Sequence, residues 1–269
     1  MPQKSDFVKL RAFAKLNLSL KITGKRPDGF HEIDSIMQSI SLHDEVEIAP
    51  SAGGITVHCS AAEIKDNTAI KAAELILSEA KRTAGVNIHI KKNIPLASGM
   101  AGGSADAAAT LIGMNKLFGL NLHIEKLIEL GGKIGSDVPF CMVGGTARCT
   151  GRGEKILRLN PHSGAAFILV FPDLALPTKL VYDKFDIVGP GKNGNDLEKA
   201  AFELFPVISE LKCELESETG RTWKMSGSGP TLFMELDGLA DSEKHLEVLS
   251  GMNLRYQVSK RMDSGVEFI

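Results

Sequence analysis

The sequence predicts an α+β protein with two domains, and three observations lead to this fold class. Segments in which apolar and polar residues alternate are interspersed with segments of helical periodicity, without an internal repeat. The chain has 269 residues, a length typical of one or two domains. Residues 160–164 interrupt the pattern, which then starts again. We therefore predict an N-terminal domain over residues 1–160 and a C-terminal domain over residues 161–269.

The N-terminal domain is expected to begin with strands. Leucine and isoleucine alternate with polar residues over 16–22, which predicts a strand with one polar face. A Pro-Asp-Gly sequence within residues 23–32 predicts a turn after this strand. A helix is predicted over residues 68–83, where apolar residues fall on one face and Gly85 suits the C-terminal cap. Further short strands are expected over 46–48, 55–59 and 86–90.

The middle of the chain is predicted to be mainly helical. Residues 95–119 open with proline and glycine and continue as an alanine-rich helix. A second helix over residues 121–130 is expected to end at Gly131 and Gly132. Two short strands, 146–149 and 155–159, are expected to pair as a hairpin.

The C-terminal domain is predicted to mix strands and helices again. A loop rich in glycine, asparagine and proline over 189–195 separates two of its helices. The elements expected there are, in order, a strand over 167–171, a helix over 178–185, a helical region over 196–217, strands over 223–225 and 231–236, a helix over 241–250 and a strand over 254–260.

Composition excludes several classes of protein. The chain has 31 Lys+Arg and 33 Asp+Glu, a formal charge of −2, which argues against a nucleic-acid-binding protein that works through a basic face. Its four cysteines are scattered singly, in neither a disulfide nor a zinc-site spacing. The N-terminal residues lack a signal-peptide core, and the longest apolar run, 165–171, is too short to cross a bilayer. We expect a cytoplasmic protein without membrane contacts.

The segment PLASGMAGGS (95–104) is the most informative motif. It follows a predicted strand and opens a predicted helix, so its glycines and the first N–H groups of the helix can surround an anion such as a phosphate. Ser104 can cap the helix or offer its hydroxyl to a phosphate or metal ion. The segment is neither a Walker A sequence nor a GxGxxG fingerprint. Taken alone, it is equally compatible with a tight connection between a strand and a helix.

Three other segments carry candidate functional residues. The sequence AFAKLNLSLKITGKRPDGFHEI places Lys15 and Asn17 on one strand face, although an edge strand exposes such residues as well. In GSDVP (135–139), Asp137 is either a functional carboxylate or a helix N-cap. A second glycine-serine turn, MSGSGPTLF (225–233), lies between two predicted strands and would suit an ordinary hairpin.

These four segments, in this order, resemble motifs of the GHMP kinase superfamily. PTKLVYDKF (177–185) and NDLE (195–198) also look like segments of one member, a kinase of isoprenoid synthesis. The resemblance implies an ATP-binding N-terminal domain with a fold like that of the second domain of ribosomal protein S5. It further implies a ferredoxin-like C-terminal α+β domain, with the active site in the cleft between the two.

The resemblance also implies an activity and a set of site residues. The protein would transfer the γ-phosphoryl group of ATP to the 2-hydroxyl of a cytidine-diphosphate-linked methylerythritol. Asp137 would be the catalytic base, with Lys15 beside it. Asn17, Phe30, His31 and Tyr182 would bind the substrate. The residues expected to bind the ATP phosphates are Pro95, Leu96, Ala97, Ser98, Gly99, Met100, Ala101, Gly102, Gly103, Ser104 and Ala105. Mg²⁺ is expected with ATP, held mainly by phosphates and water, without a protein metal site.

Four positions depart from the usual superfamily pattern. Ser98 and Ala101 stand where glycine is common, and Ala105 where a second serine often stands. Phe30 replaces a common tyrosine, which preserves stacking on a base but removes a phenol hydroxyl. Alternative interpretations are another small-molecule GHMP kinase, of homoserine or mevalonate type, a non-catalytic binding protein with the same fold, and a structural protein with glycine-rich turns. We expect a monomer or a weak homodimer.

Overall fold

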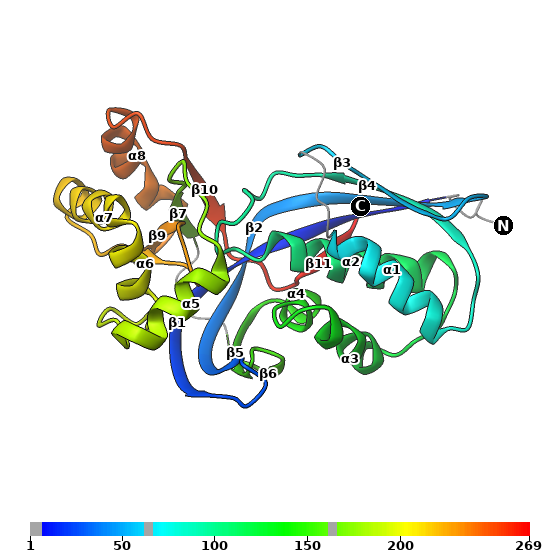
Figure 1. Cartoon of the computed structure of the whole chain (residues 1–269). Coiled ribbons are helices and arrows are strands. Elements are labelled where there is room, and N and C mark those ends of the chain that lie inside the picture. Colours follow the sequence, from blue (N-terminus) through cyan, green and yellow to red (C-terminus); the bar gives the residue numbers. More distant parts are fainter. Residues whose placement is uncertain (1–6, 62–66, 161–165) are drawn as a thin grey trace.

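Two sheets and their covering helices make up the fold (Figure 1). The computed structural model describes residues 7–61, 67–160 and 166–269. In chain order the elements are β1 (Val8–Lys25), β2 (His31–Ser51), β3 (Ile55–Cys59), α1 (Thr68–Glu79), β4 (Gly85–Lys91), α2 (Gly102–Leu117), α3 (Ile124–Ile134), α4 (Val138–Val143), β5 (Thr146–Gly151), β6 (Lys155–Arg158), β7 (Ala166–Val170), α5 (Thr178–Val188), α6 (Glu198–Leu204), α7 (Pro206–Thr219), β8 (Lys224–Met225), β9 (Leu232–Leu236), the 3₁₀ turn η1 (Leu239–Ser242), α8 (Glu243–Ser250), β10 (Tyr256–Lys260) and β11 (Val266–Phe268).

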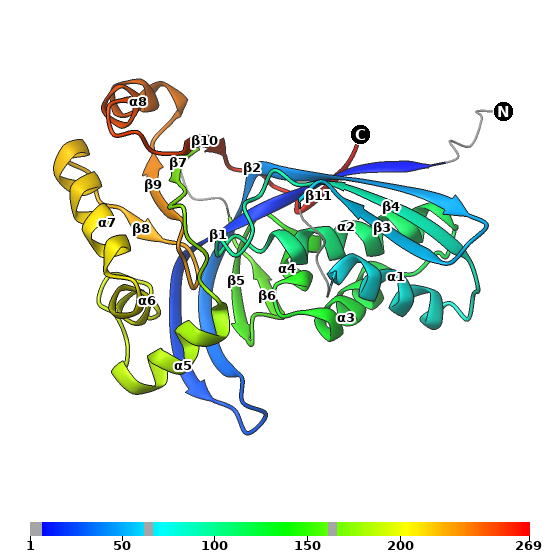
Figure 2. The ribbon, with the colours of Figure 1, turned by 45° about the horizontal axis from the view of Figure 1, so that its top comes forward.

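The first sheet has seven strands and carries helices on one face. Its main path runs β11-β1-β2-β4-β3. In addition, β5 pairs with β2, and β6 pairs with β5. Helices α1 to α4 cover the same side of this sheet (Figure 2). Small residues let α2 approach closely, because a Cβ on Gly113 would lie 2.6 Å from Ile48 Cδ1 and 2.9 Å from Leu10 Cδ1. The alanine-rich sequence of α2 is therefore explained by packing against the sheet.

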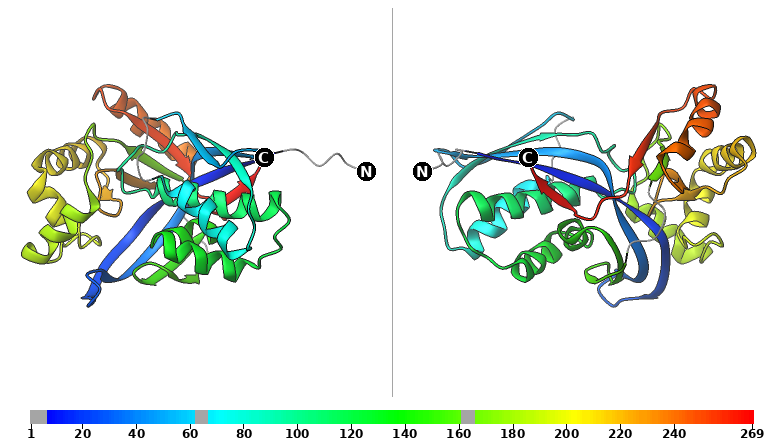
Figure 3. Two further views of the ribbon diagram at one scale, coloured as in Figure 1. Left: turned by 45° about the vertical axis from the view of Figure 1, so that its right-hand side comes forward. Right: turned by 180° about the vertical axis from the view of Figure 1, so that it is seen from behind.

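The second sheet has four strands in the order β10-β7-β9-β8. Helices α5 to α8 accompany it, and Trp223 is among its largest fully buried side chains. The β1–β2 hairpin extends from the first sheet toward these elements (Figure 3). Leu20 of β1 belongs to the same hydrophobic cluster as Trp223. One long strand thus contributes to the cores on both sides of the molecule.

The structure confirms the α+β fold class and most predicted elements, and it corrects several boundaries. Gly131 and Gly132 lie inside α3 instead of ending it, because a Cβ on Gly131 would come within 2.9 Å of Val138 and Met142 on the adjoining α4. The predicted helical region 196–217 is divided into α6 and α7 at Pro206, which cannot continue a helix from within.

Strands were predicted over 16–22 and 46–48, inside β1 and β2, but the full length of these two strands and the last strand, β11, were not predicted. β1 and β2 pair over most of their length, from Val8 opposite Ile48 to Lys25 opposite His31. β11 pairs with β1 in the first sheet, so the chain returns there after the second sheet. The predicted boundary at 160/161 involves residues 161–165, which lie outside the described residues, and it stays a prediction. Within the ranges described, no helix is both long and apolar enough to span a membrane.

Candidate active site

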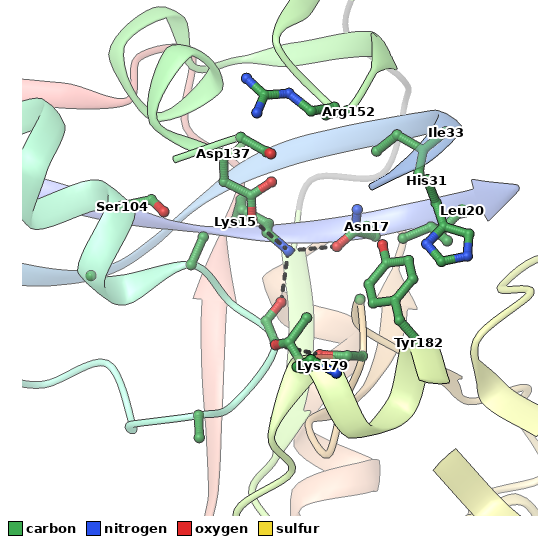
Figure 4. A pocket seen from close by; sticks show the side chains of 18 of the residues that line it. Lys15, Asn17, Leu20, His31, Ile33, Ser104, Asp137, Arg152, Lys179 and Tyr182 are labelled. Carbon is green, nitrogen blue, oxygen red and sulfur yellow. Dashed lines mark hydrogen bonds and ion pairs between the residues drawn. The ribbon is translucent and has the colours of Figure 1, made fainter. Parts of the chain in front are cut away.

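A cavity of about 910 Å³ lies where β1, β2, the glycine-rich segment, the start of α4 and the start of α5 meet (Figure 4). It brings together residues from segments far apart in the sequence. The predicted site residues that line it are Lys15, Asn17, Phe30, His31, Pro95, Leu96, Ala97, Ser98, Gly99, Ala101, Gly102, Gly103, Ser104, Asp137 and Tyr182. Met100 and Ala105 do not line it, because both side chains are buried in the core of the first sheet. These two can offer a ligand only backbone atoms.

Lys15 lies at the centre of the cavity and is almost fully buried. Its Nζ donates hydrogen bonds to Asn17 Oδ1 at 2.6 Å and to the Gly99 carbonyl oxygen at 2.8 Å, and it is 3.6 Å from Asp137 Oδ2. A buried ammonium group is costly unless its N–H groups are paired. These three oxygen atoms therefore hold the Lys15 ammonium group in one place beside the Asp137 carboxylate.

Asp137 occupies the N-cap position of α4, but its side chain makes no capping hydrogen bond. The carboxylate instead extends toward Lys15 and the cavity, and the side chain is 30% exposed (Figure 4). Pro139 lies in the first turn of α4, where its missing N–H leaves no helical hydrogen bond unmade. Of the two interpretations of this aspartate, the geometry therefore favours the functional carboxylate over the helix cap.

The glycine-rich segment forms a tight connection between β4 and α2. Gly99 has φ +75°, and a Cβ there would lie 2.2 Å from the Ser226 carbonyl oxygen, so only glycine fits. Ala101, at the N-cap of α2, has φ 59°, a conformation that costs a non-glycine residue about 1–2 kcal/mol. No side chain caps α2 at this end. Its first N–H groups lack intrahelical partners and lie at the cavity wall, which is an anion-binding arrangement.

Three charged side chains lie together next to this segment, and the sequence did not predict this cluster. Lys92 Nζ pairs with Asp44 Oδ2 and, at 2.7 Å, with Asp106 Oδ2. Burial raises the pKa of Asp106 to about 7. A Cβ on Gly102 would lie 3.1 Å from Lys92 Nζ and from Ile94 Cγ2. Gly102 is therefore needed for packing against this cluster, in addition to any role toward a phosphate.

The other end of the cavity is aromatic. The His31 and Tyr182 rings lie with centroids 4.9 Å apart, and burial raises the pKa of Tyr182. His31 Nε2 is 2.7 Å from Asp186 Oδ1, and the same carboxylate pairs with Lys25 at 2.5 Å. These bonds lower the pKa of Asp186, that from Lys25 being the larger cause. Phe30 is half exposed and lies beneath the Arg152 guanidinium, 4.9 Å from it.

Several lining residues were not anticipated from the sequence. Charged ones come from the β1–β2 hairpin, from α5 and from the turn after β5: Lys25, Asp28, Arg152, Lys179, Asp183 and Asp186. Their periodicity resembles that of any solvated surface, so no local signal distinguishes them. The MSGSGP turn had a clearer signal, its motif. Its Gly227 and Ser228 line the cavity, and the buried Ser226 Oγ donates to the Gly99 carbonyl oxygen at 3.1 Å.

The chain matches two family models and many relatives. Residues 67–145 match the GHMP kinases N terminal domain, and residues 185–251 match GHMP kinases C terminal. A 4-diphosphocytidyl-2-C-methyl-D-erythritol kinase of Clostridium acetobutylicum is 40% identical over 88% of this chain and 93% of its own length. The kinase of the same name from Acetivibrio thermocellus is also 40% identical, over 89% of this chain and 92% of its own length.

Solved structures agree. A crystal structure of 4-(cytidine 5'-diphospho)-2C-methyl-D-erythritol kinase has a TM-score of 0.78 and 30% identity, and covers 94% of this chain and 98% of its own. A homoserine kinase from Cytophaga hutchinsonii has a TM-score of 0.76 at 17% identity over 100% and 99% of the two chains, which shows the shared fold alone. The chain therefore belongs to the GHMP kinase superfamily and, within it, to the family of 4-diphosphocytidyl-2-C-methyl-D-erythritol kinases.

Proposed function

We propose that the protein transfers the γ-phosphoryl group of ATP to the 2-hydroxyl of 4-diphosphocytidyl-2-C-methyl-D-erythritol, a step of isopentenyl diphosphate biosynthesis by the methylerythritol phosphate pathway. The observation that carries the proposal is the Lys15–Asp137 pair, 3.6 Å apart, beside an uncapped helix N-terminus in one cavity. Family membership supports the same activity.

Asp137 is the proposed general base. Its carboxylate accepts the proton of the substrate hydroxyl as the new oxygen–phosphorus bond forms and the bond from the γ-phosphorus to the β-phosphate oxygen breaks, releasing ADP. The Lys15 ammonium group lies next to this carboxylate and offsets negative charge on the transferring group. Asn17 accepts a hydrogen bond from Lys15 and donates one to Ser35 Oγ at 2.8 Å, so it orients the lysine.

The segment 95–105 is the proposed phosphate site. The N–H groups of Gly102, Gly103 and Ser104 open α2 and face an anion at its positive end. Mg²⁺ supplies charge neutralisation when it enters with ATP. In the parts of the chain that the structure describes, no group of three His, Cys, Asp or Glu side chains could hold a metal. The Ser104 hydroxyl, ATP phosphates and water fit that ion instead.

The aromatic end of the cavity is the proposed cytosine site. Phe30 and Tyr182 supply faces for stacking, and His31 reads the edge of the base. Because a carboxylate accepts hydrogen bonds, Asp186 favours the tautomer with the proton on His31 Nε2. The other ring nitrogen, Nδ1, then serves as an acceptor, which suits the exocyclic amino group of a cytosine.

Location, partners and assembly complete the proposal. We propose that the enzyme acts in the cytoplasm on small molecules only, without nucleic-acid partners, as a monomer or weak homodimer. The near-neutral charge and the unpaired state of all four cysteines, in the described structure, support this. We further propose that the segments 1–160 and 161–269 form the two domains, with β11 of the second segment adding a strand to the sheet of the first.

One assay tests the proposed function. The purified protein is mixed with ATP, Mg²⁺ and one acceptor, and ADP release is followed. We expect turnover with the cytidine-diphosphate-linked methylerythritol and none with homoserine or mevalonate. Preference for homoserine or mevalonate would favour another GHMP kinase. An ATP-induced rise in melting temperature without turnover would instead indicate a binding protein.

A further inference from the structure

We propose that Asn195 is a positioning residue for Lys15. It lies in the loop before α6, and it joins the glycine-serine turn Ser226–Gly227 to the strand that carries the lysine. It touches neither Lys15 nor Asp137. The inference rests on the proposed kinase activity, in which Lys15 stands beside the transferring phosphoryl group.

The Asn195 side chain is buried, and all its hydrogen-bonding capacity is directed at the backbone. It is 3% exposed. Its Nδ2 donates to the carbonyl oxygens of Met225 and Gly227, each at 2.8 Å, and its Oδ1 accepts from the Leu197 N–H at 3.0 Å. One amide thus holds the carbonyl groups of the two residues that flank Ser226. Aspartate has the same shape but would turn an acceptor toward both carbonyls.

The turn held by Asn195 contacts the surroundings of Lys15 directly. Ser226 is fully buried, and its Oγ accepts from the Asn17 N–H at 3.2 Å and donates to the Gly99 carbonyl oxygen. That carbonyl oxygen also accepts from Lys15 Nζ. A Cβ on Gly227 would lie 3.3 Å from Lys15 Nζ and 3.1 Å from Asn17 Oδ1. The turn backbone therefore forms one wall of the lysine site.

The backbone around Asn195 is attached to β1 on its other side. The Leu20 N–H donates to the Gly194 carbonyl oxygen, and the Asp196 N–H to the Leu20 carbonyl oxygen, both at 2.8 Å. Asp196 Oδ2 accepts from the Ile22 N–H at 2.7 Å. β1 also carries Lys15. Asn195 therefore fixes the spacing between the strand and the turn, which enclose the ammonium group from two directions.

A displaced turn would move the Gly99 carbonyl and, with it, Lys15 Nζ. Misplacement of a catalytic group by about 1 Å can lower the rate about 100-fold. The triphosphate is proposed to bind at the first N–H groups of α2 and the base at α5, and the hydrogen bonds of the Asn195 side chain go to Met225, Gly227 and Leu197 instead. We therefore expect kcat to change more than KM.

The test compares Asn195→Asp with Asn195→Ser, which shortens the side chain and retains an acceptor. Steady-state kinetics are measured per folded enzyme, with the folded fraction obtained from circular dichroism at the assay temperature. We expect kcat to fall about 10- to 100-fold, with KM for both substrates near the wild-type values. The matched control is Asn193→Ala in the same loop, which removes the hydrogen bond that Asn193 Nδ2 donates to Glu198 Oε2 at 2.8 Å. Its kcat should remain close to that of the wild type.

Three outcomes would overturn the proposal. The first is wild-type kcat in a folded Asn195 variant, and the second is an equal loss in Asn193→Ala. The third is loss of folding in both variants, since the asparagine would then serve stability alone. Failure of the proposed function is distinguishable, because the wild-type chain itself would then not phosphorylate the cytidine-diphosphate-linked acceptor.

Discussion

Lys15 shows how a single side chain depends on distant parts of the sequence. Its ammonium group meets an amide from β1, a carbonyl from the glycine-rich segment and a carboxylate from the start of α4. Removing one partner of a buried charge costs more than the pair contributes, because the remaining charge is left uncompensated. Substitution of any of these partners should therefore affect catalysis through the position of the lysine.

Asp137→Asn is expected to fold and bind both substrates, but to turn over slowly. The amide keeps the shape of the carboxylate and cannot accept the hydroxyl proton, so kcat should fall about 10²- to 10⁴-fold. The coupled ADP-release assay gives kcat and KM, and calorimetry reports ligand binding. Asp241→Asn, at a surface ion pair with Arg221, is the matched control. Near-normal turnover of Asp137→Asn would rule out its assignment as the base.

Asp106 makes stability depend on pH. Burial raises its pKa from 3.8 to about 7, so the folded chain binds more protons than the unfolded chain between these values. By linkage, its contribution to stability declines as the pH rises through this window. The asparagine of Asp106→Asn cannot titrate. As the pH is raised from 5 to 8, the free energy of unfolding of the variant should therefore increase relative to that of the wild type. Urea unfolding at both pH values measures this, and a constant difference in the free energy of unfolding would contradict it.

At the scale of elements, α2 performs two tasks, one with its N-terminus and one with its buried face. Its first turn faces the cavity without a capping side chain, and its buried alanines pack on the first sheet. The absence of acidic residues in the first turn leaves the positive end of the helix dipole available to an anion. A substitution that stabilises the first turn of α2 with a negative charge should therefore weaken ATP binding.

Ser104→Asp tests this separation. A carboxylate near a helix N-terminus contributes about 0.3–1 kcal/mol to stability, so the melting temperature should not fall. The same charge repels the ATP phosphates, and we expect KM for ATP to rise about tenfold, equivalent to about 1.4 kcal/mol. Kinetics and thermal unfolding give both quantities. Ser78→Asp, exposed in the last turn of α1, should leave KM for ATP unchanged and lower the melting temperature slightly, because a negative charge is unfavourable at a helix C-terminus. An unchanged KM for ATP would argue against the phosphate site.

Local patterns predicted elements well where one face of a helix or strand decides the structure. The helix at α1 and the hairpin β5–β6 follow from periodicity and turn residues. The helix end predicted at Gly131 was wrong because the small size of this residue serves the contact between α3 and α4, which no local pattern encodes. Lys15 and Asp137 were predicted as partners from motifs, and they do meet. The Lys92–Asp44–Asp106 cluster was missed because Lys92 is 48 residues from Asp44 and 14 from Asp106 in the sequence, and the three belong to no motif.

At the scale of the whole molecule, β1 connects the two sheets. It lies between β11 and β2 in the first sheet, and its Leu20 belongs to the core of the second. Loss of its outer neighbour should therefore weaken the whole fold. Three residue pairs join β1 to β11. The Phe13 N–H also donates a hydrogen bond to the Gly265 carbonyl oxygen at 3.0 Å, just before β11.

A chain truncated after Asp263 should melt at a lower temperature than the full chain. It lacks β11, and each lost backbone hydrogen bond contributes about 1 kcal/mol. Differential scanning calorimetry measures the change. Phe268→Ser, at a side chain that is 47% exposed, keeps the backbone pairing and is the control. Equal melting temperatures for the truncated and full chains would contradict the role assigned to β11.

The position of β11 also matters during synthesis on the ribosome. The part of β1 that pairs with β11 is translated some 250 residues before β11 itself. Until then one edge of β1 lacks its partner strand, and unpaired edges are templates for association with other chains. A prematurely terminated chain would retain this open edge next to the strand segment that carries Lys15. Nascent chains should therefore depend more on chaperones than the finished protein does.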